Sequence, residues 1–177
     1  MLAFTRGMIG PMDFTPGGMR NRNDHLSVFF TLPQVYGTRA GEMSLYVIYD
    51  EPLKMLCDAP SAYEAEPDIP SFISQIPTTW DDTKVLDGVF GEFIIKARKT
   101  GNTWFIAGLN GEQSRTIQLD LSWLQNDAYV GEILRDGANA HRIGIDYVIE
   151  QINISKNSSP EITIPAGGGF IMRIEGK

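Results

Sequence analysis

The sequence has one cysteine, two histidines and no long run of apolar residues. Cys57 can form no internal disulfide, and its position at the end of an apolar helical pattern predicts a small buried side chain rather than a nucleophile. Because no apolar stretch approaches the roughly 18 residues of a transmembrane helix, we expect no membrane span.

Basic residues are also few, since 15 Lys and Arg stand against 22 Asp and Glu and give a net charge of -7. Proteins bind nucleic acids mainly through Lys and Arg that displace counterions from the phosphates, so nucleic acid is not an expected partner. The 177 residues suffice for one large or two small domains but fall short of the roughly 250 residues of a (β/α)₈ barrel. The N-terminus does not resemble a signal peptide, because Arg6 interrupts its short apolar start, and we expect the natural start to lie upstream.

The stretch Phe4–Gly18 is rich in proline and glycine. Proline fixes its own φ and restricts the residue before it, so the pattern excludes a helix and a long strand and predicts a loop after a buried strand that ends near Phe4 to Arg6. This loop carries Arg6 and Asp13, for which two roles are open. They could position a substrate, or they could satisfy backbone groups or each other.

A helix is predicted after the N-cap candidate Thr38, because apolar residues recur at helical spacing from Ala40. Pro52 should break or kink this helix near Asp50, and one or two further turns are expected from Leu53 to Cys57. A proline-punctuated segment follows, in which Pro70 can be the first residue of a short helix that continues through 71–76. We interpret this segment as a bridge between two units, residues 1–77 and 78–177.

After residue 78 the apolar period changes from that of a helix to two. A mainly β protein with a small α part is therefore expected, and eight short antiparallel strands should form a two-layer sandwich. Trp104 lies in a strand that is apolar on both faces and should be central. The predicted strands are 83–87, 91–98, 103–109, 115–121, 128–135, 146–154, 161–164 and 169–175.

Four blocks of the sequence, in the same order, resemble the C-terminal part of glycoside hydrolase family 97, which includes α-glucosidases and α-galactosidases of gut Bacteroidetes. The blocks are Phe4–Gly17, Tyr36–Ala40, Tyr46–Pro60 and Thr79–Gly88. The resemblance implies that residues 1–77 are the last strand, loop and helix of a catalytic (β/α)₈ barrel, and that a β-sandwich follows.

The same resemblance implies the functional properties of a longer enzyme. Its catalytic glutamates and its calcium-binding glutamates are expected upstream of this chain, so the chain alone should be inactive. Its substrate would be an oligosaccharide with α-glucosidic or α-galactosidic bonds, and its location periplasmic or secreted. The sandwich would serve as a scaffold and could form a homodimer contact.

We expect no catalytic residue and no metal site within the chain itself. His25 has no second histidine or carboxylate at ligand spacing. Three groups of acidic residues lack the neighbours of an active site and are interpreted as solvated faces or turns: Glu64 with Glu66, Asp81 with Asp82, and Glu42 with Asp50 and Glu51.

Tryptophan supports a different class of function, a carbohydrate-binding β-sandwich module. Sugars stack on exposed aromatic rings, and Trp80 and Trp123 lie at the domain junction and at a turn, where such exposure could occur. Packing in a core or an interface is the other use of these two rings.

Overall fold

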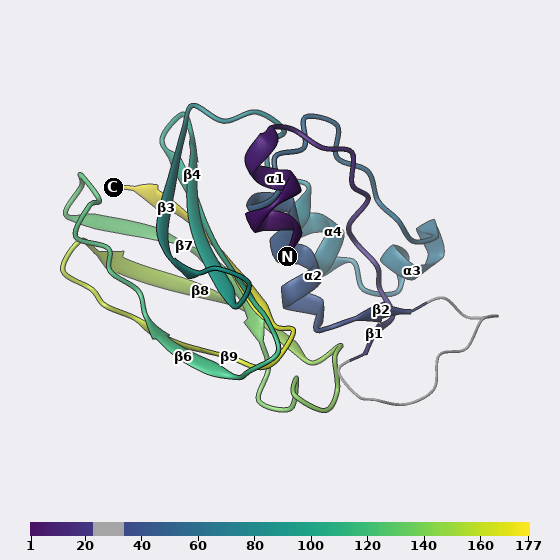
Figure 1. Ribbon diagram of the computed structural model, residues 1–177. Helices are drawn as coiled ribbons and strands as arrows, with labels where there is room; N and C mark the ends of the chain where they lie inside the picture. The colour runs from purple at the N-terminus through teal and green to yellow at the C-terminus, as the bar shows by residue number, and fades with distance from the viewer. Residues whose placement is uncertain (23–33) are drawn as a thin grey trace.

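The computed structural model describes residues 1–22 and 34–177, and Figure 1 shows the order of its elements. His25, considered above, lies outside the described residues. The helices are η1 (Leu2–Phe4), α1 (Arg6–Ile9), α2 (Arg39–Ile48), α3 (Pro60–Glu64) and α4 (Asp68–Ile73). The strands are β1 (Asn21–Arg22), β2 (Val35–Tyr36), β3 (Asp82–Val89), β4 (Phe93–Thr100), β5 (Thr103–Asn110), β6 (Arg115–Gln118), β7 (Ala128–Asp136), β8 (Tyr147–Ser155), β9 (Glu161–Ile164) and β10 (Gly169–Gly176).

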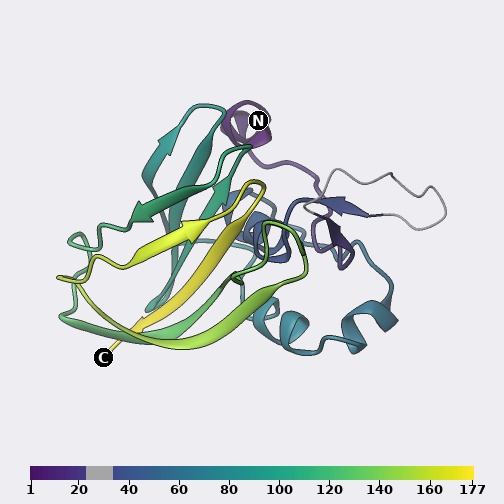
Figure 2. The same ribbon diagram turned by 90° about the horizontal axis from the view of Figure 1, so that it is seen from below.

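The eight strands after residue 78 form an antiparallel sheet of six strands, in the order β3-β4-β5-β10-β7-β8, and a smaller sheet of β6 and β9. The predicted mainly β fold is confirmed, and each predicted strand overlaps one of these eight. The strand predicted over 115–121 is shorter than expected and ends at Gln118 as β6. Figure 2 shows the small sheet on one side of the large sheet and the helices on the other.

The large sheet separates two hydrophobic cores. In β5 the side chains of Trp104 and Ile106 lie in the core beneath β6 and β9, whereas Phe105 and Ala107 lie in the core beneath α2. Successive side chains of a strand point to opposite faces, so a strand that is apolar at every position is one buried on both sides. The central position predicted for the strand of Trp104 is confirmed, since β5 lies between β4 and β10.

Helix α2 is the largest element on the other face of the sheet. As predicted, Thr38 is its N-cap, and the hydroxyl oxygen of Thr38 accepts a hydrogen bond from the Gly41 amide at 3.0 Å. The helix ends at Ile48, and the further turns predicted from Leu53 to Cys57 are absent. None of the helices in the described ranges is both long enough and apolar enough to cross a bilayer.

Contacts remote in sequence explain why the helix does not resume. The Cys57 amide donates to the Pro16 carbonyl at 3.1 Å, and the Tyr46 hydroxyl donates to the Met55 carbonyl at 3.0 Å. The segment therefore lies against the N-terminal loop and against the side of α2. Cys57 itself is exposed, so the prediction of a buried thiol was wrong.

The N-terminus also differs from the prediction. Instead of a strand ending near Phe4 to Arg6, the chain forms the helical turns η1 and α1. Gly10, with φ of 142°, ends α1 directly before Pro11, so the helix is limited to one turn. The short helix predicted over 71–76 is present but lies earlier, over Asp68–Ile73.

Replacing Leu134 with alanine tests the core between α2 and the sheet. Leu134 is fully buried, and a Leu→Ala change in a core typically costs about 2–5 kcal/mol of the free energy of unfolding. Urea denaturation followed by circular dichroism should show this loss for L134A. The matched control L53A removes a side chain that is 72% exposed and should change stability by less than about 0.5 kcal/mol. Equal effects of the two changes would contradict the assigned core.

Candidate functional site

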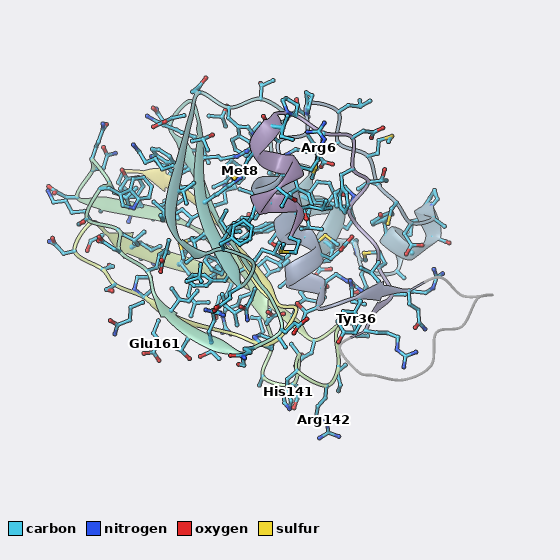
Figure 3. The ribbon with its side chains drawn as sticks, in the orientation of Figure 1. Arg6, Met8, Tyr36, His141, Arg142 and Glu161 are labelled. Atoms are coloured by element: carbon cyan, nitrogen blue, oxygen red, sulfur yellow. The ribbon has the colours of Figure 1, made fainter. Side chains whose placement is uncertain are left out.

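Arg6 and Asp13, the predicted substrate-side pair, both have exposed side chains. The Arg6 guanidinium donates to the carbonyls of Gly10 at 3.2 Å and Pro11 at 3.0 Å. Arg6 thus holds the turn after α1, and Figure 3 shows it near one end of the molecule. A role of Arg6 and Asp13 towards a substrate stays a prediction.

The carboxylate of Glu51 is enclosed in the protein, close to Asp13 and Lys54 in space. Glu51 is 0% exposed, and the Phe14 backbone amide lies beside its carboxylate. Burial raises its pKa to about 7, the Lys54 ammonium opposes this shift and the Asp13 carboxylate adds to it. The interpretation of Glu51 as part of a solvated face was wrong.

Glu42 on α2 is half-buried and binds the N-terminal loop. Its Oε1 accepts hydrogen bonds from the amides of Gly17 at 2.9 Å and Gly18 at 3.2 Å. Burial raises the pKa of Glu42, and these two amides oppose the shift. Gly17 has φ of 103°, and a Cβ there would lie 2.4 Å from the Tyr46 hydroxyl, so this loop requires glycine. The position of Glu42 in line with Tyr46 and Tyr49 was the sequence signal that its face of α2 is not solvated.

Cationic side chains gather at the C-terminal end of α2. Lys96 donates to the Ile48 carbonyl at 2.9 Å, and Arg98 donates to the Tyr49 carbonyl at 3.3 Å. These carbonyls have no partner within the helix, and the helix dipole favours positive charge there. Burial lowers the pKa of Lys96 to about 8. The large sheet thereby caps the helix that packs on it.

The two tryptophans of the sugar-stacking hypothesis are half-buried and pack against other side chains. The ring of Trp80 lies edge-on to Phe105 with centroids 5.6 Å apart, and the cations of Lys54 and Arg98 lie 5.0 and 5.4 Å from its centroid. Trp123 packs edge-on against Trp104 at 4.7 Å. A sugar-binding role of Trp80 and Trp123 stays a prediction.

The most extensive polar cluster surrounds Arg39, which is fully buried at the start of α2. Its Nη1 lies 2.7 Å and its Nη2 3.2 Å from the two carboxylate oxygens of Glu66, so the pair is bidentate. Its Nε donates to Asn21 Oδ1 at 2.5 Å, and its Nη2 also donates to the Met19 carbonyl at 2.5 Å. The Tyr147 ring of β8 lies 5.6 Å from the guanidinium carbon.

This Arg39 cluster joins the N-terminal segment, the helices and the sheet. The Tyr147 hydroxyl donates to Asp68 of α4 at 2.8 Å, and the Arg39 amide donates to the Gly144 carbonyl at 2.6 Å. Glu66 is therefore the partner of a buried cation, although its own side chain is 33% exposed. Asp81 and Asp82 do form turns, since they accept hydrogen bonds from the amides of Gly101 and Thr83.

Comparison with known proteins assigns this arrangement to a family. Residues 79–175 match the family model described as glycosyl-hydrolase 97 C-terminal, oligomerisation. The chain belongs to this family. The predicted resemblance to glycoside hydrolase family 97 is thus confirmed.

The relatives extend the similarity to the whole chain. The chain is 40% identical over 176 residues to a retaining alpha-galactosidase of Bacteroides thetaiotaomicron and 32% identical over 171 residues to a probable retaining alpha-galactosidase of Streptomyces bingchenggensis. It spans 27% and 24% of these relatives. A family 97 enzyme of Pseudoalteromonas sp. strain K8 has been solved in complex with panose and with acarbose. Its structure matches this chain with 35% identity and a TM-score of 0.88, and the match covers 100% of this chain and 28% of the enzyme's chain.

Replacing Arg39 with methionine should strongly destabilise the family 97 C-terminal chain. The change removes the donor to the buried Asn21 side chain and to the Met19 carbonyl, as well as the ion-pair partner of Glu66, whose side chain is 33% exposed. Each buried polar group left without a partner typically costs about 1–3 kcal/mol. Thermal and urea denaturation of R39M would measure the loss. The control R142M removes an exposed guanidinium and should leave the unfolding midpoint nearly unchanged. A midpoint of R39M equal to that of R142M would refute the importance of the cluster.

The free energy of unfolding should fall as pH rises from about 4.5 to about 7. The reason is that the folded state binds a proton on Glu51 more tightly than the unfolded state, in which the pKa of Glu51 has its ordinary value of 4.5. The stabilisation is complete below pH 4.5 and is lost as pH passes through the folded-state pKa. We expect E51Q to be more stable than the parent at pH 8 and to lose less stability between pH 4.5 and 8. Burial also raises the pKa of Asp136 to about 7. The E51Q variant should therefore still lose some stability as pH rises, because Asp136 remains.

Urea midpoints at several pH values measure this effect, and the exposed Glu64→Gln serves as the control. A pH profile of E51Q identical to that of the parent would show that Glu51 does not titrate as proposed.

Proposed function

We propose that this chain is the C-terminal part of a longer retaining glycoside hydrolase that cleaves α-galactosidic bonds in oligosaccharides. The observation that carries the proposal is the 40% identity to a retaining alpha-galactosidase over 99% of this chain. An α-glucosidase is the alternative, favoured by the panose and acarbose complexes of the 35% identical Pseudoalteromonas enzyme.

The proposed role of the chain in that enzyme is a scaffold, with the catalytic carboxylates in the remaining part. Hydrolysis of a glycosidic bond requires two carboxylates that flank it. Glu42 and Glu66 bind backbone amides and a buried guanidinium, and Glu51 is enclosed. Glu150 and Glu161 do share a cavity with Asp136, but Glu150 is 2.6 Å from Arg135, and Asp136 accepts a hydrogen bond from the Gly169 amide at 2.8 Å.

The 177-residue chain alone should therefore not hydrolyse nitrophenyl α-galactoside or nitrophenyl α-glucoside, whereas the longer protein should hydrolyse the galactoside. Turnover is measured by nitrophenol release from both preparations at equal concentration. Hydrolysis by the chain alone would refute the scaffold role. A preference of the longer protein for the glucoside would favour the alternative substrate.

Calcium is a further proposal for the longer enzyme. In residues 1–22 and 34–177, no three His, Cys, Asp or Glu side chains are arranged to hold a metal ion, so this part of the chain does not fit a calcium site. A chelator should abolish the activity of the longer protein and leave the melting temperature of the 177-residue chain unchanged. If the chelator lowered the melting temperature of the 177-residue chain, this would indicate a metal bound to the chain itself.

We also propose that the longer enzyme is periplasmic or secreted, and cell fractionation would test this location.

A further proposal is that the β-sandwich contributes a homodimer contact. Strand β3 supports this contact, because it is an edge strand of the large sheet. Among its residues only Leu86 is partly buried, and Val85 is 64% exposed. The outer edge of such a strand leaves backbone N–H and C=O groups unpaired, so a second chain can pair with it. V85E should shift the sedimentation coefficient from dimer to monomer, whereas V130E on β7 should not. A parent chain that sediments as a monomer at all concentrations would refute the contact.

A further inference from the structure

A groove crosses the end of the sandwich where β2 meets the loops after β5, β7 and β9. A cavity of about 750 Å³ is lined by Tyr36, Glu112, Ser114 and His141 together with the backbone of the glycine-containing loops. A second cavity of about 570 Å³ shares Ser114 and His141 and continues to Asp136, Glu150 and Glu161. Because the cavities share two lining residues, we treat them as one site and call it the end groove.

Tyr36 presents an aromatic ring at one end of the groove. Its side chain is 69% exposed. Figure 3 shows Glu161, His141 and Tyr36 along the same side of the molecule. An exposed aromatic ring that borders a cavity is a flat apolar surface on which a ligand can stack. Trp80 and Trp123, in contrast, pack against other rings.

Buried hydrogen bonds fix the loops that form the floor of the groove. Asn110 is 5% exposed, and its amide nitrogen donates to the carbonyls of Gln113 at 2.7 Å and Pro165 at 2.9 Å. The Gly167 carbonyl accepts from the Thr38 amide at 3.0 Å, which ties this floor to the start of α2. A pre-formed site loses little conformational entropy when it binds a ligand.

The second half of the groove offers polar groups. Asp136 is 5% exposed, and its carboxylate is held by the Gly169 amide and the Thr38 side chain, so it forms part of the wall of the groove. Glu150 and Arg135 form a fixed pair 2.6 Å apart, and Glu161 faces them from β9. Ionised carboxylate oxygens accept hydrogen bonds from hydroxyl groups such as those of a sugar.

We propose that the end groove binds an uncharged oligosaccharide, with one sugar ring stacked on Tyr36 and hydroxyl groups bound by Glu150 and Glu161. The carboxylates disfavour an anionic saccharide. A quaternary ammonium ligand would need a cage of several rings, and Tyr36 is the only aromatic side chain that lines these two cavities in the described structure. The proposal assigns a binding function to this chain and does not rest on the activity of the longer protein.

Binding to the intact 177-residue chain can be measured by isothermal titration and saturation-transfer NMR. The probes are maltotriose and raffinose as neutral saccharides, trigalacturonate as the anion and choline as the cation. We expect at least one neutral saccharide to bind and the two charged probes not to bind. Y36A should weaken binding roughly three- to tenfold, the effect of losing one aromatic contact, and Y36F should retain it.

The matched control is F90A, which removes another exposed ring from the turn after β3 and should leave affinity unchanged. Circular dichroism of each variant verifies that it is folded. The proposal is overturned if neither neutral saccharide binds, if a charged probe binds in preference, if Y36A binds as tightly as the parent, or if binding depends on Trp123 instead.

Discussion

One buried guanidinium, that of Arg39, joins parts of the chain that are far apart in sequence. A cation removed from water is stable only if hydrogen-bond acceptors surround it, and Arg39 finds them in Asn21, Met19 and Glu66. Tyr147 of the sheet covers its guanidinium. The N-terminal segment, α2, the segment before α4 and β8 must therefore reach their final positions together. Figure 1 shows these elements around the start of α2.

This constraint makes the large sheet the middle layer of the protein. One of its faces packs against the small sheet, and the other packs against α2. The opposite end of α2 is fixed by Lys96 and Arg98, which extend from β4 to its last carbonyls. A helix held by charge at both ends and by a core along its length is suited to a scaffold, as we propose for this part of a family 97 enzyme.

The strands were predictable from the sequence because their alternation is a local property. Trp104 to Ala107 are apolar at every position, and this local pattern indicates a strand buried on both faces, as the two cores confirm. The end of α2, the exposure of Cys57 and the burial of Glu51 were not predictable, because each depends on a distant segment. The end groove has the same origin, since Tyr36 and His141 meet only in the folded chain.

The central claim is that the helices and the large sheet share one core and unfold as one unit. Hydrogen exchange of the native chain, read peptide by peptide by mass spectrometry, tests it most directly. The amides of α2 should be protected to the same free energy as those of β10, the strand on which α2 packs. Rapid exchange throughout α2 while β10 stays protected would contradict the claim.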